Sequence, residues 1–323
     1  MSTLPTRQDF RLLHRLRVRW AEVDMQAIVF NPHYLMYLDT AITEYWRASA
    51  LPYHESFLAL GGDMVVRKAT VDFISSARMD DVLDIGMRFV EAGRSSMRFQ
   101  GGIFRGDELL ATGELAYVYI APNAPKGTKP SREVPQALRE ALAAYEGGDD
   151  MVQLHLGHWD SVRERAMPLR HTVFAQEKGI PAELMSDASD TTAHHVLLTN
   201  RLGVPLATGR LVPLEGGRPE PVGQTGQNRQ GEQNGQVGQI GRMAVLASQR
   251  SQNLGGRMLQ ALLAHARQLG MAEVMLHAQA GAVRFYSRHG FQCQGQPFEE
   301  AGLVHQTMVL KLHQAEVVES AGS

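Results

Sequence analysis

One long amphipathic helix is predicted early in the chain, and strand-like runs follow it. Asn31 and Pro32 form the helix start, because Asn favours helix caps and Pro favours the first helical position. Apolar residues then recur three and four apart until about Ala50; they are Tyr34, Leu35, Leu38, Ile42 and Tyr45. Turn signals separate the strand-like runs, which are 64–73, 82–91, 96–104 and 109–120. One helix followed by an antiparallel meander predicts an α+β unit with the sheet wrapped around the helix.

The chain of 323 residues is about twice the length of a typical domain, so it has room for a second core. Prolines between positions 122 and 130 end the meander, because proline cannot continue an inner strand. A short predicted helix over 134–145 then stops at Gly147-Gly148, ahead of two aspartates. We therefore expect a first domain at 1–148, a linker at 149–156 and a second domain at 157–312.

Two further segments are too polar to join a core. Residues 215–239 are rich in Gly and Gln, contain almost no large apolar side chains, and have recognisable strands before and after them. We expect an inserted loop there, within the second domain. Residues 313–323 follow the last strand-like run and are expected to form a flexible tail.

The composition argues against several classes of protein. Hydrophobic residues make up 44% and charged residues 20%, as in ordinary globular proteins, and no apolar run approaches the roughly 20 residues that cross a bilayer. The basic N-terminus lacks an apolar core followed by a cleavage site, so we expect a cytoplasmic protein without membrane partners. A net charge of −2 argues against nucleic acid as a partner. Cys293 is the single cysteine, so neither an internal disulfide nor a thiol-based metal site is expected.

The residues around the predicted helix start carry a motif. The run RWAEVDMQAIVFNPHYLMYLDTAITEYWR resembles the hotdog-fold acyl-CoA thioesterases of the hydroxybenzoyl-CoA type, and the resemblance covers about residues 14–120. It implies that Asp24 is the catalytic carboxylate, which attacks the thioester carbonyl or activates water. Asn31 and His33 are candidate polar wall residues, and backbone N–H groups at the helix start would bind the developing oxyanion. The family usually has Gly where this chain has Ala27.

Taken alone, these residue types also have ordinary structural roles. Asp24 reads as a turn residue, and His33 as a hydrogen-bonded residue of the first helical turn. The resemblance favours the catalytic role for Asp24. It also implies a homo-oligomer that binds acyl-CoA in a cleft between subunits.

The second half of the sequence alternates strand and helix patterns. A strand-like run ending in GRMAVL leads through RSQNLGG into a helix, and the segments LHAQAGAVRFYSRHGF and PFEEAGLVHQTM follow. At these spacings the segments resemble the GNAT family of acetyltransferases, its ElaA-like branch, from about Trp159 to Leu312. The resemblance implies a mixed, mostly antiparallel sheet flanked by helices, and transfer of an acyl group to an amine. The predicted fold class is α+β with two domains, a hotdog domain followed by a GNAT domain.

The resemblance also implies where coenzyme A binds. The family's pyrophosphate loop, R-x-x-G-x-G/A, falls on 250–255, with Asn253 in place of the first glycine and Gln252 where a second basic residue is frequent. Asn tolerates the positive φ that glycine would supply. Tyr286 falls on the general acid that protonates the departing thiolate. The residues expected to contact coenzyme A are Met243, Ala244 and Val245 along the pantetheine arm, and Arg250, Ser251, Gln252, Asn253, Leu254, Gly255 and Gly256 around the pyrophosphate.

No single residue stands out as the base that takes a proton from the acceptor amine. Glu299, Glu300 and His305 are candidates, and each has an equally ordinary role on a surface or strand. His194 and His195 lack other metal-ligating residues nearby in the sequence, so we expect them to be structural and expect no metal site.

We therefore predict a bifunctional enzyme, a thioesterase and an N-acetyltransferase, that uses acyl-CoA and an amine as substrates and holds no permanently bound cofactor. One alternative stays open: one domain is a non-catalytic module that binds acyl-CoA or drives oligomerisation and regulates the other. A dehydratase is disfavoured, because dehydratases of the hotdog fold usually use a His with an acidic partner on a differently placed loop.

Overall fold

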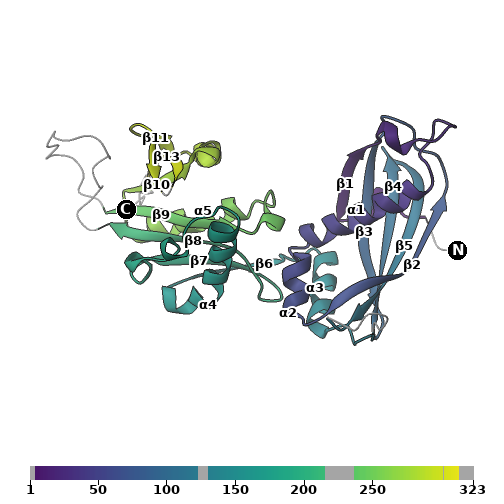
Figure 1. Cartoon of the computed structure of the whole chain (residues 1–323), viewed down its shortest axis with the longest axis horizontal. Helices are drawn as coiled ribbons and strands as arrows, with labels where there is room; N and C mark the ends of the chain where they lie inside the picture. Colours follow the sequence, from purple (N-terminus) through teal and green to yellow (C-terminus); the bar gives the residue numbers. More distant parts are fainter. Residues whose placement is uncertain (1–3, 123–129, 215–235, 301, 313–323) are drawn as a thin grey trace, which may run out of the picture. The chain divides into compact units, whose positions relative to one another are not determined.

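A computed structural model describes residues 4–122, 130–214, 236–300 and 302–312 (Figure 1). The chain divides into two compact units. The first comprises the residues up to Gln153 together with Asn200–Val204, and the second comprises Leu154–Thr199 and the residues from Pro205 onward. Each unit combines helices with its own sheet, which confirms the α+β class.

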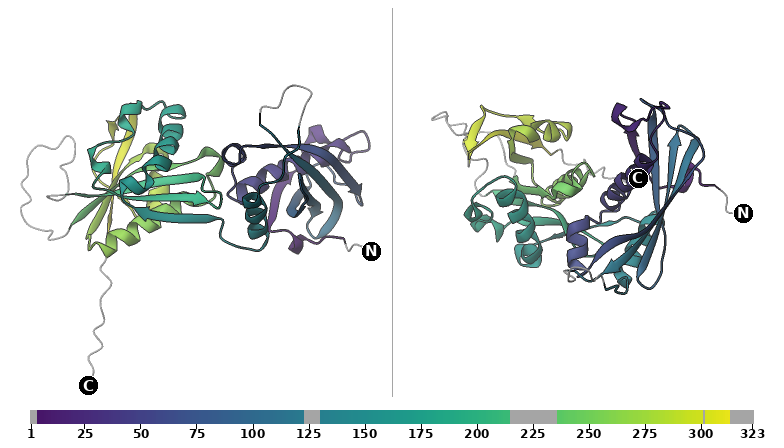
Figure 2. Two further views of the ribbon diagram at one scale, coloured as in Figure 1. Left: turned by 90° about the horizontal axis from the view of Figure 1, so that it is seen from below. Right: turned by 45° about the vertical axis from the view of Figure 1, so that its right-hand side comes forward.

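The first unit is built on an antiparallel sheet in the order β1-β3-β4-β5-β2. Its strands are β1 (Leu12–Arg17), β2 (Asp63–Phe73), β3 (Val82–Ala92), β4 (Ser96–Arg105) and β5 (Glu108–Ile120). Its helices are α1 (Pro32–Ala48), α2 (Tyr53–Ala59) and α3 (Gln136–Glu146). Helix α1 packs against β1, β2, β3 and β5, so the sheet wraps around it (Figures 1 and 2). The expected hotdog arrangement is confirmed.

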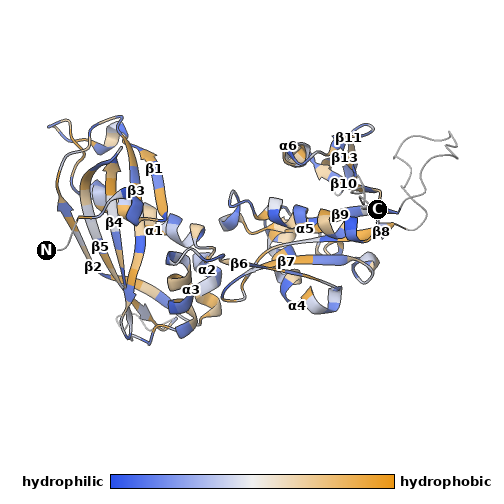
Figure 3. Ribbon diagram, turned by 180° about the vertical axis from the view of Figure 1, so that it is seen from behind, coloured by the Kyte–Doolittle hydropathy of each residue, from blue (hydrophilic) through white to orange (hydrophobic). Residues whose placement is uncertain are grey.

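Helix α1 buries one continuous face against this sheet. Tyr34, Leu38, Ile42 and Tyr45 of the predicted face are buried, but Leu35 is 41% exposed. A residue directly after Tyr34 lies about 100° further around the helix, which turns Leu35 away from the sheet. The colouring in Figure 3 shows α1 as a mixture of apolar and polar positions, as a helix with one buried face requires.

Glycines in the middle of the sheet let α1 approach it closely. Gly101 of β4 and Gly113 of β5 are partners in the β4–β5 ladder. A Cβ atom at either position would overlap the side chain of Leu38, which is completely buried. The two glycines therefore leave the space that Leu38 of the central helix fills.

The second unit contains a sheet in the order β11-β13-β10-β9-β8-β7-β6, with β12 paired to β13. Its strands are β6 (Val152–Gly157), β7 (His194–Asn200), β8 (Pro205–Leu214), β9 (Val237–Val245), β10 (Glu273–Gln279), β11 (Gln292–Cys293), β12 (Phe298–Glu300) and β13 (Leu303–Lys311). Its helices are α4 (Trp159–Arg170), which continues into the π-helical segment η3 (His171–Gln176), α5 (Leu254–Gln268) and α6 (Val283–Arg288). Strands β9 and β10 pair in parallel. Strand β10 pairs antiparallel with β13, and β8 pairs antiparallel with both of its neighbours, β7 and β9. The mixed, mostly antiparallel sheet is confirmed.

Helices cover both faces of this second sheet. The neighbouring residues His194 and His195 of β7 point to opposite faces, as successive strand residues do. The ring of His194 lies 4.5 Å from that of His265 of α5, and the ring of His195 lies 4.8 Å from that of Trp159 of α4. Helices α4 and α5, which both pack on β8 and β9, therefore lie on opposite faces.

Short 3-10 turns complete the secondary structure. They are η1 (Arg7–Asp9), η2 (Trp20–Glu22), η4 (Ala182–Leu184), η5 (Ala188–Asp190), η6 (Ala247–Gln249) and η7 (Ala280–Ala282). Within the described ranges, none of the helices combines the length and the apolar character that crossing a membrane requires.

The structure corrects two of the predicted segments. Residues 149–156, expected as a linker, include most of β6, because these residues pair with β7 at the edge of the second sheet. The loop expected at 215–239 ends earlier, since β9 begins at Val237, which pairs with Leu214. Residues 215–235 and the expected tail at 313–323 lie outside the described residues. The domain limits 1–148 and 157–312 stay a prediction.

Candidate active sites

The loop that carries Asp24 is tied to itself by backbone hydrogen bonds. The Asp24 N–H donates to the Ile28 carbonyl at 2.9 Å, and the Ala27 N–H donates to the Asp24 carbonyl at 3.0 Å. Asp24 Oδ1 accepts the Gln26 N–H at 2.8 Å, which is the turn role expected of an aspartate here. Among the described residues, Asp24 Oδ2 has no hydrogen-bond partner, and the side chain is half-buried. The carboxylate is thus fixed through one oxygen and free at the other.

Ala27 occupies a left-handed backbone conformation, with φ 58°. A residue with a Cβ adopts this region at some cost, whereas glycine adopts it freely. The loop therefore keeps the geometry that the family's usual glycine supplies, and it does so with an alanine.

Glu22 is a buried carboxylate two residues before Asp24, and sequence reasoning missed it. It is 3% exposed and accepts hydrogen bonds from the Arg19 backbone N–H and the Tyr37 hydroxyl, both at 2.8 Å. Burial raises the pKa of Glu22, but these hydrogen bonds and the Arg19 guanidinium outweigh burial, and the net pKa is lowered. The Glu22 carbonyl accepts the Phe30 N–H at 2.9 Å. Glu22 therefore anchors the Asp24 loop to helix α1.

The start of α1 differs from the capped start that the sequence predicts. Asn31 has helical dihedral angles, and its side chain makes no capping hydrogen bond. Pro32 has no N–H, and the N–H groups of His33 and Tyr34 donate to the carbonyls of Phe30 and Asn31. These N–H groups are therefore occupied and do not point at a ligand. The His33 ring nitrogen Nδ1 is buried without a hydrogen-bond partner among the described residues.

Strands β9 and β10 separate part of the way along the second sheet. Their parallel pairing joins 237–240 to 273–276 and ends at Ile240 and Leu276. Beyond that point β9 stays paired with β8 to Val245, and β10 stays paired with β13 to Gln279. We call the opening between 241–245 and 277–279 the β9/β10 wedge. Backbone groups on an unpaired inner edge can bind an extended polar ligand, and Met243, Ala244 and Val245 lie on this edge.

The loop after β9 has the geometry of a phosphate site. Ser251 and Asn253 have φ 66° and 57°, so Asn253 holds the left-handed conformation of the glycine that it replaces. Helix α5 begins at Leu254, and the N–H groups of its first turn have no helical carbonyl four residues before them. Such N–H groups and the positive end of the helix dipole favour an anion. Gln252 is exposed beside them.

Arg250 of this loop is held by a carboxylate that sequence reasoning missed. Its two terminal nitrogens donate to the two oxygens of Glu177, each at 2.6 Å, and one of them also reaches the Val245 carbonyl at 3.3 Å. The Arg250 guanidinium lowers the pKa of Glu177. The next residue, Lys178, donates to Gln279 Oε1 at 2.7 Å. Residues 177 and 178 thus meet the ends of β9 and β10 at the open end of the wedge.

Tyr286 lies on α6, which follows β10 through the turn η7. Its side chain is buried, with ring centroids 4.9 Å from Phe285 and 5.9 Å from Phe291. Burial raises the pKa of Tyr286 to about 12. The hydroxyl therefore stays protonated near neutral pH, which a general acid requires.

The candidate bases of the second unit lie on the β12–β13 hairpin. Glu299 and Glu300 are exposed, whereas His305 is buried and its Nδ1 lies 2.9 Å from the Leu303 carbonyl. Glu300 Oε2 lies 3.5 Å from Nδ1 of His277, a β10 residue that sequence reasoning did not single out. The structure thus pairs one of the three candidates with an imidazole.

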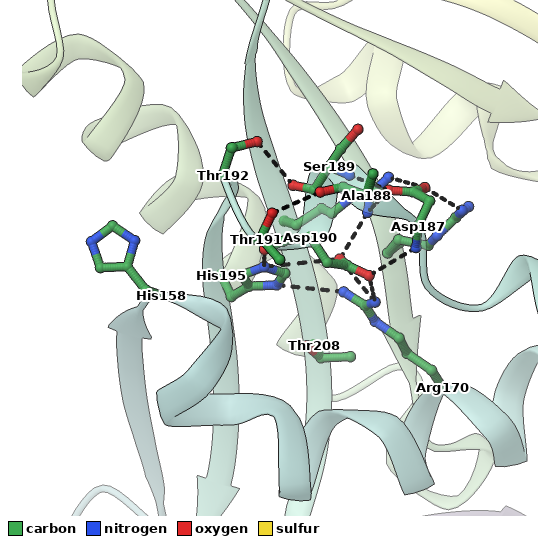
Figure 4. A network of polar contacts seen from close by, with 12 residues as sticks. His158, Arg170, Asp187, Ala188, Ser189, Asp190, Thr191, Thr192, His195 and Thr208 are labelled. Atoms are coloured by element: carbon green, nitrogen blue, oxygen red, sulfur yellow. Dashed lines mark hydrogen bonds and ion pairs between the residues drawn. The ribbon is translucent and has the colours of Figure 1, made fainter.

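A network of charged side chains lies on the α4 face of the second sheet (Figure 4). Arg170 is completely buried and donates to both Asp190 oxygens, at 2.9 and 3.0 Å. Arg210 joins Asp190 to Asp187, and Arg242 also binds Asp187. Hydrogen bonds from Arg210 are the main cause that lowers the pKa of Asp187 to about 2. Because the network joins α4, η5, β8 and β9, we assign it a structural role. In the described part of the chain, no group of His, Cys, Asp and Glu side chains has the arrangement of a metal site.

Two family models match separate parts of the chain. The model described as "Thioesterase superfamily" matches residues 26–112, and the model described as "Acetyltransferase (GNAT) domain" matches residues 218–312. The first match includes the end of the Asp24 loop, and the second includes the β9/β10 wedge, the loop of residues 250–256 and Tyr286.

Individual relatives match one half of the chain each. The Bacillus subtilis (strain 168) protein named "Uncharacterized N-acetyltransferase YjcF" is 29% identical over 146 residues, which is 45% of this chain and 89% of that protein. The "Acyl-CoA thioester hydrolase YbgC" of Escherichia coli O157:H7 is 29% identical over 133 residues, which is 40% of this chain and 90% of that protein. A solved thioesterase from Thermus thermophilus, in complex with coenzyme A and Zn, is 27% identical, covers 43% of this chain and 98% of its own, and has a TM-score of 0.36.

The chain therefore joins a thioesterase-superfamily domain of the hotdog fold to a GNAT acetyltransferase domain.

Proposed function

We propose that the protein is a bifunctional enzyme that acts on acyl-CoA in two ways. The first unit hydrolyses the thioester, and the second transfers the acyl group to an amine. One observation carries the proposal: each unit matches a family of coenzyme A enzymes and holds the matching candidate residue in suitable surroundings, Asp24 with a free carboxylate oxygen and Tyr286 with a protonated hydroxyl. Coenzyme A thioesters are substrates, and no permanently bound cofactor is part of the proposal.

Hydrolysis in the first unit centres on Asp24. Its carboxylate either attacks the thioester carbon or takes a proton from a water molecule that attacks it. The carbon–sulfur bond then breaks and coenzyme A leaves; where Asp24 itself attacked, water hydrolyses the resulting acyl–Asp24 anhydride. Both routes give a carboxylic acid and coenzyme A. We assign Asn31 and His33 to the polar wall of this site. Since the backbone N–H groups of His33 and Tyr34 are already bonded, the imidazole of His33 is the better candidate to face the oxyanion.

Transfer in the second unit uses the β9/β10 wedge. The pantetheine arm would bind the inner edge of β9 at Met243, Ala244 and Val245, and the pyrophosphate would bind the loop of residues 250–256 at the start of α5. Arg250 would then exchange part of its bonding from Glu177 to phosphate. The acceptor nitrogen attacks the carbonyl carbon and loses a proton to a base, the carbon–sulfur bond breaks, and Tyr286 gives its proton to the thiolate.

We also propose that the first unit associates with a second copy of the chain. Strand β2 is an edge strand of 11 residues, and a long uncovered edge readily pairs with another strand. Large apolar side chains are exposed at Val66 and Phe73 of β2, and at Trp20 and Met25 beside Asp24. Light scattering after gel filtration should give at least a dimer, and a monomer at micromolar concentration would contradict the proposal.

The thioesterase assignment is tested by Asp24→Asn. An amide neither attacks the thioester nor takes a proton, so thiol release from acyl-CoA should fall by about 10²-fold or more. Asp107→Asn is the matched control, since Asp107 is fully exposed in the β4–β5 turn. Hydrolysis by Asp24→Asn at the rate of the control would remove Asp24 from the mechanism.

The transferase assignment is tested by Tyr286→Phe. This change keeps the buried ring and removes the acidic proton, so amine-dependent thiol release should fall by about 10²-fold. Coenzyme A binding, measured by calorimetry, should stay the same. Coenzyme A binding without any turnover of either kind would instead support a binding module in this unit.

A further inference from the structure

The acceptor amine needs a base, and the residues on the β12–β13 hairpin leave that role open. An alkyl amine is protonated near neutral pH, and only the neutral form attacks a thioester. His305 is poorly suited, because it is buried and its Nδ1 faces the Leu303 carbonyl. Tyr286 is protonated and already serves as the acid. The search for a base therefore turns to the wedge itself.

His277 lies at the closed end of the β9/β10 wedge. The last pair between the two strands is Leu276 with Ile240, and His277 is the next residue of β10. Gly241 is the matching first unpaired residue of β9, two positions before Met243, where the pantetheine site of the proposed function begins. A reacting group that enters the wedge along β9 would thus end next to the side chain at position 277.

The surroundings of His277 are those of an oriented imidazole. Its side chain is 29% exposed, its ring centroid lies 4.9 Å from that of Phe298, and its Nδ1 lies 3.5 Å from Glu300 Oε2. No described residue forms a hydrogen bond with Nε2 of His277. The Glu300 carboxylate lies beside one ring nitrogen, which leaves Nε2 as the nitrogen open to accept a proton.

The hairpin geometry selects Glu300 and not Glu299 for this pair. Residues 298 and 300 share one face of β12, because side chains alternate along a strand. Phe298 and Glu300 both contact His277, so this face of β12 is turned toward the imidazole and Glu299 is turned away.

We propose that His277 is the general base of the transferase and that Glu300 is its positioning residue. The proposal rests on the transfer activity of the second unit. Nε2 of His277 takes a proton from the acceptor amine as the nitrogen bonds to the thioester carbon. The carbon–sulfur bond breaks, and the thiolate takes the proton of Tyr286. The products are an amide and coenzyme A, and solvent then carries the proton of the imidazolium back to the Tyr286 phenolate, which restores both groups.

The experiment uses the full chain with Asp24→Asn, so that thiol release reports transfer and not hydrolysis. Acetyl-CoA is combined with a panel of primary amines that includes an aliphatic diamine, a free amino acid and a lysine peptide. The variants are His277→Gln, Glu300→Gln and, as a matched control, His171→Gln, since His171 is exposed in the π-helical segment. Coenzyme A binding is measured for each variant by calorimetry.

His277→Gln should lower kcat about 10²-fold while KM for acetyl-CoA and coenzyme A binding stay unchanged. The deficit should shrink as the pH is raised toward the pKa of the amine, because solvent then supplies the neutral amine without a base. Glu300→Gln should lower kcat several-fold, and this deficit should also shrink as the pH is raised. If His277 had only a structural role, kcat of His277→Gln would not recover at high pH.

Three results would contradict the proposal, and they differ from one another. Transfer by His277→Gln at the rate of the His171→Gln control, at every pH, excludes His277 while the proposed transfer stands. No transfer by any variant with any amine, although coenzyme A binds, refutes the transfer itself and the base with it. If His277→Gln misfolds and loses coenzyme A binding, the Glu300→Gln variant provides the test instead, because Glu300 is exposed. An unchanged kcat in Glu300→Gln would contradict the proposed pairing of His277 with Glu300.

Discussion

At the scale of single residues, Ala27 carries strain that a smaller residue would relieve. Its φ of 58° lies in the left-handed region, which costs a residue with a Cβ about 1–2 kcal/mol. Glycine removes that cost but gives the unfolded chain more freedom, worth about 0.4–1 kcal/mol. Ala27→Gly should therefore stabilise the first unit by roughly 0.5–1 kcal/mol in urea unfolding and should preserve hydrolysis.

The control for Ala27→Gly is a second Ala→Gly substitution that should lower the unfolding free energy instead of raising it. Ala143 is exposed in helix α3, where a glycine should cost about 1 kcal/mol. Equal destabilisation by the two substitutions would mean that Ala27 is not strained in solution.

Asp190 is the residue on which the charged network of the second unit depends. It accepts hydrogen bonds from Arg170, which is completely buried, and from Arg210. Asp190→Asn keeps the shape but leaves Arg170 without a counter-charge, so the second unit should lose about 3–5 kcal/mol of unfolding free energy. Asp149→Asn, which breaks a solvent-exposed pair with Arg201, should cost at most about 1 kcal/mol. Similar losses for both substitutions would show that the buried network carries no special stability.

The same carboxylates give the stability of the second unit a pH dependence. The pKa of Asp187 is lowered from its ordinary 3.8 to about 2, and the pKa of Asp190 is also lowered. A lowered carboxylate pKa stabilises the fold above the ordinary value and ceases to do so as the pH falls toward the folded value. This contribution should thus be complete above about pH 4 and be lost between about pH 4 and 2, and Asp190→Asn should reduce that loss.

At the scale of elements, side-chain patterns within one segment predicted the helices and strands that depend on that segment alone. The period of α1 and the four strands of the meander follow from side-chain spacing, and the structure confirms them apart from the exposed Leu35. Three contacts around the candidate sites did not follow: Glu22 with Tyr37, Glu177 with Arg250, and His277 with Glu300. Each joins residues from different elements, so only the packed fold brings the partners together. No spacing rule within one element could have found them.

The close packing of α1 on its sheet makes a prediction at this scale. Gly113→Ala would place a methyl group against the buried side chain of Leu38, so the first unit should lose about 1–3 kcal/mol through overpacking. Gly281→Ala is the control, because nothing lies within 4 Å of a Cβ there. If thermal unfolding is unchanged in Gly113→Ala, α1 does not lie as close to β5 as the structure shows.

At the scale of the whole molecule, the length of the chain predicted two domains, and the sequence motifs indicated which fold each domain has. The hotdog and GNAT resemblances gave both folds, and they gave the candidates Asp24 and Tyr286 because each lies within a contiguous motif that carries the resemblance. The limits of the units were harder to predict. Residues 149–156 follow the Gly147-Gly148 stop and were expected as a linker, yet Val152–Gly157 forms β6 at the edge of the sheet. Its apolar residues Val152, Leu154 and Leu156 alternate along the strand, but Leu154 and Leu156 are exposed.

The central claim is that one chain holds two separable acyl-CoA activities. Thiol release from a panel of acyl-CoA thioesters, with and without amines, tests it directly in the wild type, Asp24→Asn and Tyr286→Phe. The account predicts that Asp24→Asn loses only the amine-independent release and that Tyr286→Phe loses only the amine-dependent increase. Loss of both activities in either variant, or of neither in both, would contradict it.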